Sequence, residues 1–246
     1  MWATTNVDSV YQKVLALANK EQRGYITPQE FNLFANQAQM EIFEQYFYDI
    51  NQFKRTPGNS TEYSDIVGML EEKISAFEKF KIAPSSVSGS VLTLPSDLHR
   101  LGTVFSTLAT SNPVVEKIDK KNLQLILNSP LTAPTDSRPV FIHQAPTAAG
   151  VSQIKIFPAA SSYSTGNTSV NYIKKPTTVK WTYVVINDKA VHNSGATDLQ
   201  NFELHESEES ELVIKILQLA GISMKDYQLA SAASNKEVNI ISQEKQ

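Results

Sequence analysis

Residues 26–31 read Ile-Thr-Pro-Gln-Glu-Phe, and they contain the strongest helix start in the chain. Thr27 supplies a capping hydroxyl, Pro28 suits the first helical position, and Glu30 completes a capping box. Apolar and aromatic residues then recur at steps of three and four. The pattern therefore predicts a long amphipathic helix over residues 27–50.

Helical patterns also lie on both sides of this stretch. Residues 6–21 and 61–80 carry apolar stripes of helical period, and so does the segment 207–221 near the other end of the chain. Glutamates in the first turn of that last segment favour a helix start, and Gly221 is expected to end the helix. Both ends of the chain are thus predicted to be helical.

The middle of the chain has a different pattern. Pro, Gly, Ser and Thr separate short runs rich in Val, Ile, Phe and Tyr, which is typical of strands between turns. The expected strands are 91–94, 101–108, 114–118, 139–144, 153–157, 169–174 and 181–187, with one short helix at 120–127. We therefore expect an α+β fold in which a helical bundle, built from the N- and C-terminal segments, carries an inserted antiparallel β domain (a sandwich or small barrel). The expected boundaries are 1–84, 85–198 and 199–246.

Composition excludes several classes of protein. The 246 residues include no cysteine, which removes thiolate catalysis, iron–sulfur clusters and disulfides. The net charge is −3, but residues 85–198 carry 10 Lys or Arg and 6 Asp or Glu, so the middle is the basic part. This pattern fits a middle part that faces an acidic neighbour or a nucleic-acid path. A basic–apolar leader and an apolar run of membrane-spanning length are both missing from the sequence, so we expect a cytosolic protein or a particle component made there.

Catalytic and metal-binding motifs are not evident. The sequence has neither a phosphate-binding glycine loop nor a Gly-x-Ser-x-Gly elbow, and its four histidines show no metal-ligand spacing. We assign no catalytic, cofactor-binding or metal-ligating residue and expect no cofactor and no enzyme. Two short stretches have an alternative interpretation. His99 with Asp97 fits a base–orienter pair of a hydrolase, and the stretch that begins at His205 fits a helix cap better than a zinc site.

Four stretches together carry a family resemblance. They are Leu-Pro-Ser-Asp-Leu-His-Arg-Leu at 94–101, Val-Glu-Lys at 115–117 leading into Leu-Ile-Leu-Asn-Ser-Pro at 125–130, Ile-Lys-Ile-Phe-Pro at 154–158 followed by Val-Asn-Tyr-Ile-Lys-Lys-Pro at 170–176, and Phe-Glu-Leu-His-Glu at 202–206 running into 214–221. In this order, between helical ends, they resemble the head-to-tail adaptor proteins of short-tailed phages. These are ring proteins of the tail tubular protein A type, including those of crAss-like phages.

The resemblance implies a structural role in the virion. Adaptors of this kind form rings, usually of twelve subunits, that sit beneath the portal and continue the DNA channel. The implied partners are further copies of the chain, the portal protein, the next tail protein and passing DNA, which is bound non-specifically. A membrane is not implied. The implied location is the virion, assembled in the host cytoplasm.

Two sets of residues are candidates for these contacts. The two N-terminal helices carry more apolar surface than we expect one copy to cover, and a ring requires different faces to meet. The subunit-interface candidates are Val10, Val14, Phe34, Ile42, Phe43, Tyr46 and Phe47. By analogy with the family, the C-terminal tail is expected to dock on the portal through Val238, Ile240 and Ile241.

One alternative is a carbohydrate- or receptor-binding β-sandwich module of a tail or surface structure. The residues that decide this alternative are Tyr172, Trp181 and Tyr183. A groove lined by these rings would favour ligand binding, whereas their burial would disfavour it.

Overall fold

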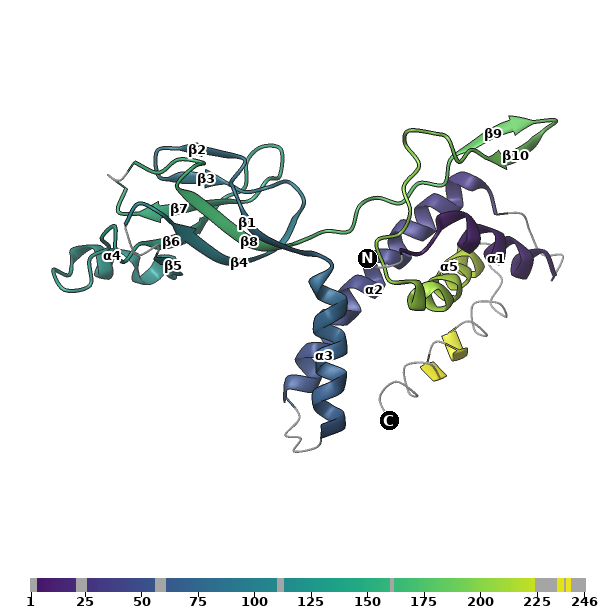
Figure 1. The fold of residues 1–246 in the computed structure, drawn as a ribbon, viewed down its shortest axis with the longest axis horizontal. Helices are drawn as coiled ribbons and strands as arrows, with labels where there is room; N and C mark the ends of the chain where they lie inside the picture. Colours follow the sequence, from purple (N-terminus) through teal and green to yellow (C-terminus); the bar gives the residue numbers. More distant parts are fainter. Residues whose placement is uncertain are drawn as a thin grey trace. The chain divides into compact units, whose positions relative to one another are not determined.

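The chain divides into two compact units. The computed structural model describes residues 4–20, 26–55, 61–109, 113–159, 162–223, 234–236 and 238–239. The helical unit comprises Met1–Ser75 and Pro176–Gln246, and the sheet unit comprises Ala76–Lys175 (Figure 1). The α+β class is confirmed. The units change at 75/76 and 175/176, whereas the sequence pattern placed boundaries at 84/85 and 198/199.

The helical unit is built from segments far apart in the sequence. Its elements are α1 (Val7–Lys20), α2 (Pro28–Arg55), α3 (Thr61–Ser75), β9 (Tyr183–Ile186), β10 (Lys189–His192), the short 3-10 helix η1 (Glu206–Glu208) and α5 (Glu209–Ser223). Helix α2 packs against α3 and α5, and α5 also packs against α1 (Figure 1). The N- and C-terminal segments thus form one bundle, as the sequence predicts.

The start of α2 is the capping box that the sequence predicts. The Glu30 backbone N–H donates to Thr27 Oγ1 at 3.3 Å, and the Thr27 backbone N–H donates to Glu30 Oε2 at 3.0 Å. These bonds satisfy two donors that a helix start leaves without helical partners. The Thr27 hydroxyl also donates to Glu30 Oε2, at 2.7 Å. This bond and that from the Thr27 backbone N–H lower the pKa of the Glu30 carboxyl, because both stabilise its charged form.

The sheet unit contains one curled, mixed sheet. Its elements are β1 (Glu78–Ile82), β2 (Ser86–Ser88), β3 (Val91–Thr93), β4 (Leu98–Ser106), β5 (Val114–Lys117), α4 (Lys120–Asn128), β6 (Val140–Gln144), β7 (Gln153–Phe157) and β8 (Thr168–Lys174). The strand order is β1-β8-β4-β5-β6-β7-β3-β2 (Figure 1). Each neighbouring pair is antiparallel except β5 and β6, which run parallel and are joined by the crossover through α4. The core lies on strands β3 to β8 and includes Leu92, Val104, Phe141, Ile156 and Val170.

Some element boundaries differ from the expected ones. The third helix ends at Ser75, and Phe80 lies in edge strand β1 instead of in a helix reaching residue 80. Helix α5 continues through Gly221 to Ser223, so this glycine does not end it. Strands β2 and β10 were not expected either.

Candidate functional site

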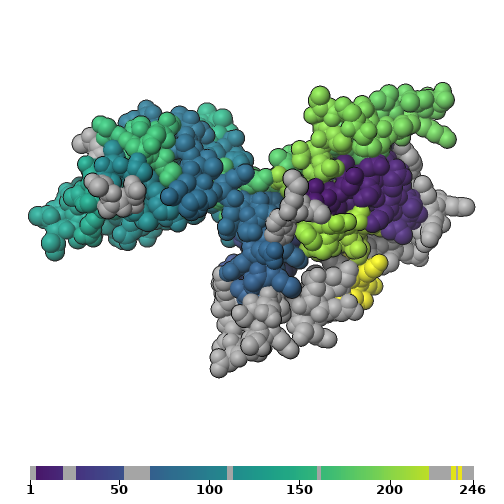
Figure 2. Space-filling model, viewed as in Figure 1, coloured from purple at the N-terminus to yellow at the C-terminus, as the bar shows by residue number. Residues whose placement is uncertain are grey.

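The most distinctive surface feature is a two-stranded hairpin, β9–β10, which we call the arm. Its strands pair from Tyr183 with His192 to Ile186 with Lys189. Asn187 and Asp188 form the two-residue turn, with φ angles of 48° and 59°. Positive φ at both positions defines a type I′ turn, whose twist matches that of paired strands. The arm projects from the rest of the helical unit (Figures 1 and 2).

The two faces of the arm differ near its base, whereas Val185 on one face and Ile186 on the other are both exposed near the tip. Because side chains alternate along a strand, Tyr183 and His192 share one face, and the rings of both stack on Trp181 with centroids 5.7 Å apart. The other face, which we call the outer face, carries Val184, Ile186 and Val191 with Lys189. These three apolar side chains are 48%, 54% and 46% exposed.

Trp181 anchors the base of the arm in the core of the helical unit. The side chain is 1% exposed, and its ring lies 4.1 Å from that of Tyr11 on α1. Its indole Nε1–H donates to Asp8 Oδ1 at 2.8 Å. A buried indole whose one polar group is paired is a stable anchor.

Side-chain amides on α2 hold the strand that leads into the arm. Asn32 Oδ1 accepts from the Trp181 N–H at 2.8 Å, and Asn32 Nδ2 donates to the Trp181 carbonyl at 3.2 Å. Asn36 forms the same two bonds with Val179, at 2.7 and 2.9 Å. Gln39 Nε2 donates to the Thr177 carbonyl at 2.9 Å. We call these three α2 residues the amide ladder.

The amide ladder determines how the arm is presented. It satisfies backbone groups of the incoming strand much as a neighbouring strand would. On its other edge the same strand pairs with Gln200 through two backbone bonds of 3.1 Å to Lys180. A firmly held base thus carries a hairpin with an apolar outer face.

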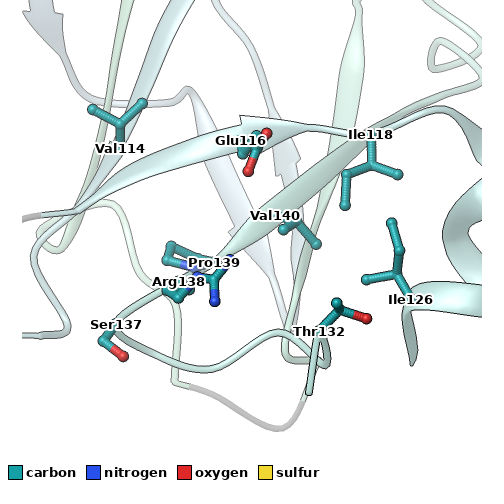
Figure 3. A pocket seen from close by; sticks show the side chains of 9 residues that line it. All are labelled: Val114, Glu116, Ile118, Ile126, Thr132, Ser137, Arg138, Pro139 and Val140. Carbon is teal, nitrogen blue, oxygen red and sulfur yellow. The ribbon is translucent and has the colours of Figure 1, made fainter. Parts of the chain in front are cut away.

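A second candidate feature is an open groove of about 290 Å³ in the sheet unit, which we call the crossover groove. Its lining comes from β5 and the residue after it, from α4, and from β6 and the residues before it (Figure 3). The lining residues include Val114, Glu116, Ile118, Ile126, Arg138 and Val140. Its volume is at the lower limit of small-molecule pockets. An open groove of this size, lined by polar as well as apolar side chains, suits one or two protruding side chains.

The sheet unit that contains the crossover groove is basic. Burial, Lys117 and Lys120 all lower the pKa of His143, which lies on the opposite face of β6 from the groove residue Val140. The whole sheet unit carries 10 Lys or Arg and 5 Asp or Glu, whereas the helical unit carries 12 and 20. The two units therefore have net charges of +5 and −8.

The structure places the subunit-interface candidates inside the helical unit. Of the seven, Phe34 is partly exposed and the others are buried: Val10, Val14, Ile42, Phe43, Tyr46 and Phe47. The chain itself covers this apolar surface, through α5 and the segment after residue 176 as well as the first helices. Contrary to the expectation from the sequence, the six buried residues therefore need no neighbouring copy to cover them. The exposed face of α2 instead carries Leu33, Glu41, Glu44 and Tyr48.

Of the tail candidates, only Val238 is among the described residues, and its side chain is 63% exposed. Ile240 and Ile241 lie outside the described residues.

The aromatic rings that would have formed a carbohydrate site do not form one together. Trp181 and Tyr172 are buried, and Tyr183 is the most exposed of the three at 36%. The Tyr172 hydroxyl donates to Asp97 Oδ1 at 3.0 Å. Burial, assisted by this carboxylate, raises the pKa of Tyr172 to about 12. Asp97 thus binds the hydroxyl of a core tyrosine, a role that differs from orienting His99 as a catalytic base.

His205 caps η1, as the sequence indicated. Its Nδ1 accepts from the Ser207 backbone N–H at 3.2 Å. Over the described ranges, no group of three or more His, Asp or Glu side chains is placed to hold a metal ion.

Comparison with known proteins adds no relatives to this description. No protein-family model matches the sequence, and no curated protein is significantly similar to it. Among the residues that the structure describes, no helix is both long and apolar enough to cross a membrane.

Neither the arm nor the crossover groove was predicted from the sequence. The arm had a usable signal, since Asn187-Asp188 separates two short runs of strand-forming residues. The groove had none, because the parallel crossover brings β5, α4 and the approach to β6 together from distant positions.

Proposed function

We propose that the chain is a non-enzymatic structural subunit of a phage virion, a head-to-tail connector ring that joins the portal to the tail and continues the DNA channel. The observation that carries the proposal is the arm, because it presents exposed apolar side chains on a base held by Trp181 and the amide ladder. Such a feature serves contacts with other proteins.

Two further observations support the proposal. Helical segments lie before and after a β unit in the chain, and this arrangement is part of the resemblance to phage adaptors. The opposite net charges of the two units favour head-to-tail contacts between copies, which generate rings when the rotation closes. Burial of Trp181 and Tyr172 argues against the alternative of a carbohydrate-binding module.

The implied partners follow from this role. They are further copies of the chain, twelve per ring by resemblance, together with the portal protein, the next tail protein and non-specifically bound DNA. The tail around Val238 remains the candidate for portal docking.

The mass of the purified particle in solution tests this proposal. Light scattering would be recorded for the full chain alone and after addition of its portal protein, followed by negative-stain imaging. We expect a ring with a central opening, either spontaneously or on the portal. Monodisperse monomers that never bind the portal would contradict the proposal.

A further inference from the structure

We propose that the outer face of the arm of one copy inserts into the crossover groove of a second copy. This inference rests on the proposed function, because it names the contact by which neighbouring ring subunits hold each other. The occupant of the groove is thus a second copy of this chain.

Both surfaces carry apolar side chains. The outer face presents Val184, Ile186 and Val191 from a narrow hairpin. The groove offers apolar side chains from β5, α4 and β6, among them the 56% exposed Val114 (Figure 3). Inserting one or two of these side chains covers apolar surface on both partners, and burial of apolar surface is the main favourable term in association.

The charges also match, at two levels. At the tip of the arm, Asp188 and Lys189 are exposed with opposite charges, and the groove is lined by Arg138 and Glu116. Asp188 can meet Arg138 while Lys189 meets Glu116. At the level of whole units, the helical unit has a net charge of −8 and the sheet unit one of +5. This difference steers the acidic unit of one copy toward the basic unit of the next.

The contact is heterologous, since arm and groove are different surfaces. A copy that inserts its arm still has an empty groove for the next copy. Contacts of this type propagate until they close into a ring or continue as a filament.

The absence of native cysteines makes disulfide trapping a direct test. One full-length copy would carry Ile186→Cys on the outer face, and the other would carry Val114→Cys in the groove. After mixing and mild oxidation, we expect a disulfide-linked heterodimer. The matched control is Val185→Cys, because Val185 is 62% exposed on the opposite face of the arm and should crosslink at least tenfold less.

A charge exchange provides a second readout. Lys189→Glu or Glu116→Lys alone should weaken association at least tenfold in analytical ultracentrifugation, and the double variant should restore it to within about threefold. Both residues are exposed, so the variants should keep the wild-type circular dichroism spectrum and thermal transition.

The outcomes separate this inference from the proposed function. Suppose that rings form, but the two cysteine variants do not crosslink and the charge exchange does not affect association. This result would overturn the inference and leave the connector role standing. A disulfide within one chain of an Ile186→Cys/Val114→Cys double variant, with no link between chains, would also overturn it. Monomers that neither associate nor bind the portal would overturn both.

Discussion

Asn32 binds the backbone of Trp181 in both directions, accepting from its N–H at 2.8 Å and donating to its carbonyl at 3.2 Å. A helix side chain here replaces the missing neighbour of an extended strand. The direction in which the arm leaves the bundle therefore depends on α2, which lies about 150 residues earlier in the sequence.

Removing one rung of the amide ladder should destabilise the helical unit. Asn36→Ala leaves the N–H and carbonyl of Val179 without their partners, so we expect the free energy of unfolding to fall by about 1–3 kcal/mol. Urea denaturation measures this change. The control is Gln37→Ala on the exposed side of the same helix, which should stay within about 0.5 kcal/mol of wild type.

The ion pair between α1 and α5 should make stability depend on acid pH. Lys13 Nζ lies 2.6 Å from Glu209 Oε2, and this contact, together with Ser9, lowers the pKa of the Glu209 carboxyl. A lowered folded-state pKa adds stability above the unfolded value of about 4.3, and this stability is lost as the pH falls through the folded-state pKa.

The matching variant is Glu209→Gln. At pH 7 it should unfold more easily than wild type, by less than about 1 kcal/mol because the pair is partly exposed. The difference should disappear as the pH is lowered below 4.3. A difference that is constant from pH 7 to pH 3 would show that the charge of Glu209 is not its cause.

Replacing each of two glycines by alanine should change the stability of the protein in opposite directions. A Cβ on Gly102 in β4 would lie 3.0 Å from the backbone oxygen of Asn171 in β8, so Gly102→Ala forces paired strands apart and should destabilise the protein by about 1–3 kcal/mol. A Cβ on Gly68 in α3 meets nothing within 4 Å, so Gly68→Ala should stabilise the helix by about 1 kcal/mol. Thermal unfolding compares the two. Equal effects would contradict this explanation.

Deleting residues 235–246 should weaken attachment to the portal while the thermal transition stays nearly unchanged. Val238 is exposed, so its loss removes little from the core. Co-sedimentation with portal particles measures the attachment. Unchanged attachment would remove the tail from the docking surface, and a large fall in melting temperature would give it a structural role instead.

Local patterns predicted most elements of the fold, because their causes are local. The start of α2 follows from Thr27 and Glu30, and the strands follow from short apolar runs between turn residues. Whether the chain itself buries Phe43 and Phe47 could not be predicted in this way. Whether an aromatic stripe is covered depends on segments that return from the far end of the chain, and both rings prove to be buried.

The error at β1 has a similar cause. Phe80 continues the helical spacing of the preceding residues, yet its strand pairs with β8 some 90 residues later. The pairing is irregular, and Lys81 has a positive φ of 50°. Such a bulged edge strand depends on its partner, so its own sequence is a weak guide.

The sheet unit begins and ends on two hydrogen-bonded neighbours, since the Lys174 N–H donates to the Phe77 carbonyl at 2.9 Å. Its two ends are therefore separated by about one strand spacing, roughly 5 Å. A gap of this width can be bridged by a very short linker. During evolution, one lineage can discard the whole insertion or graft in a different one without redesigning the bundle that hosts it.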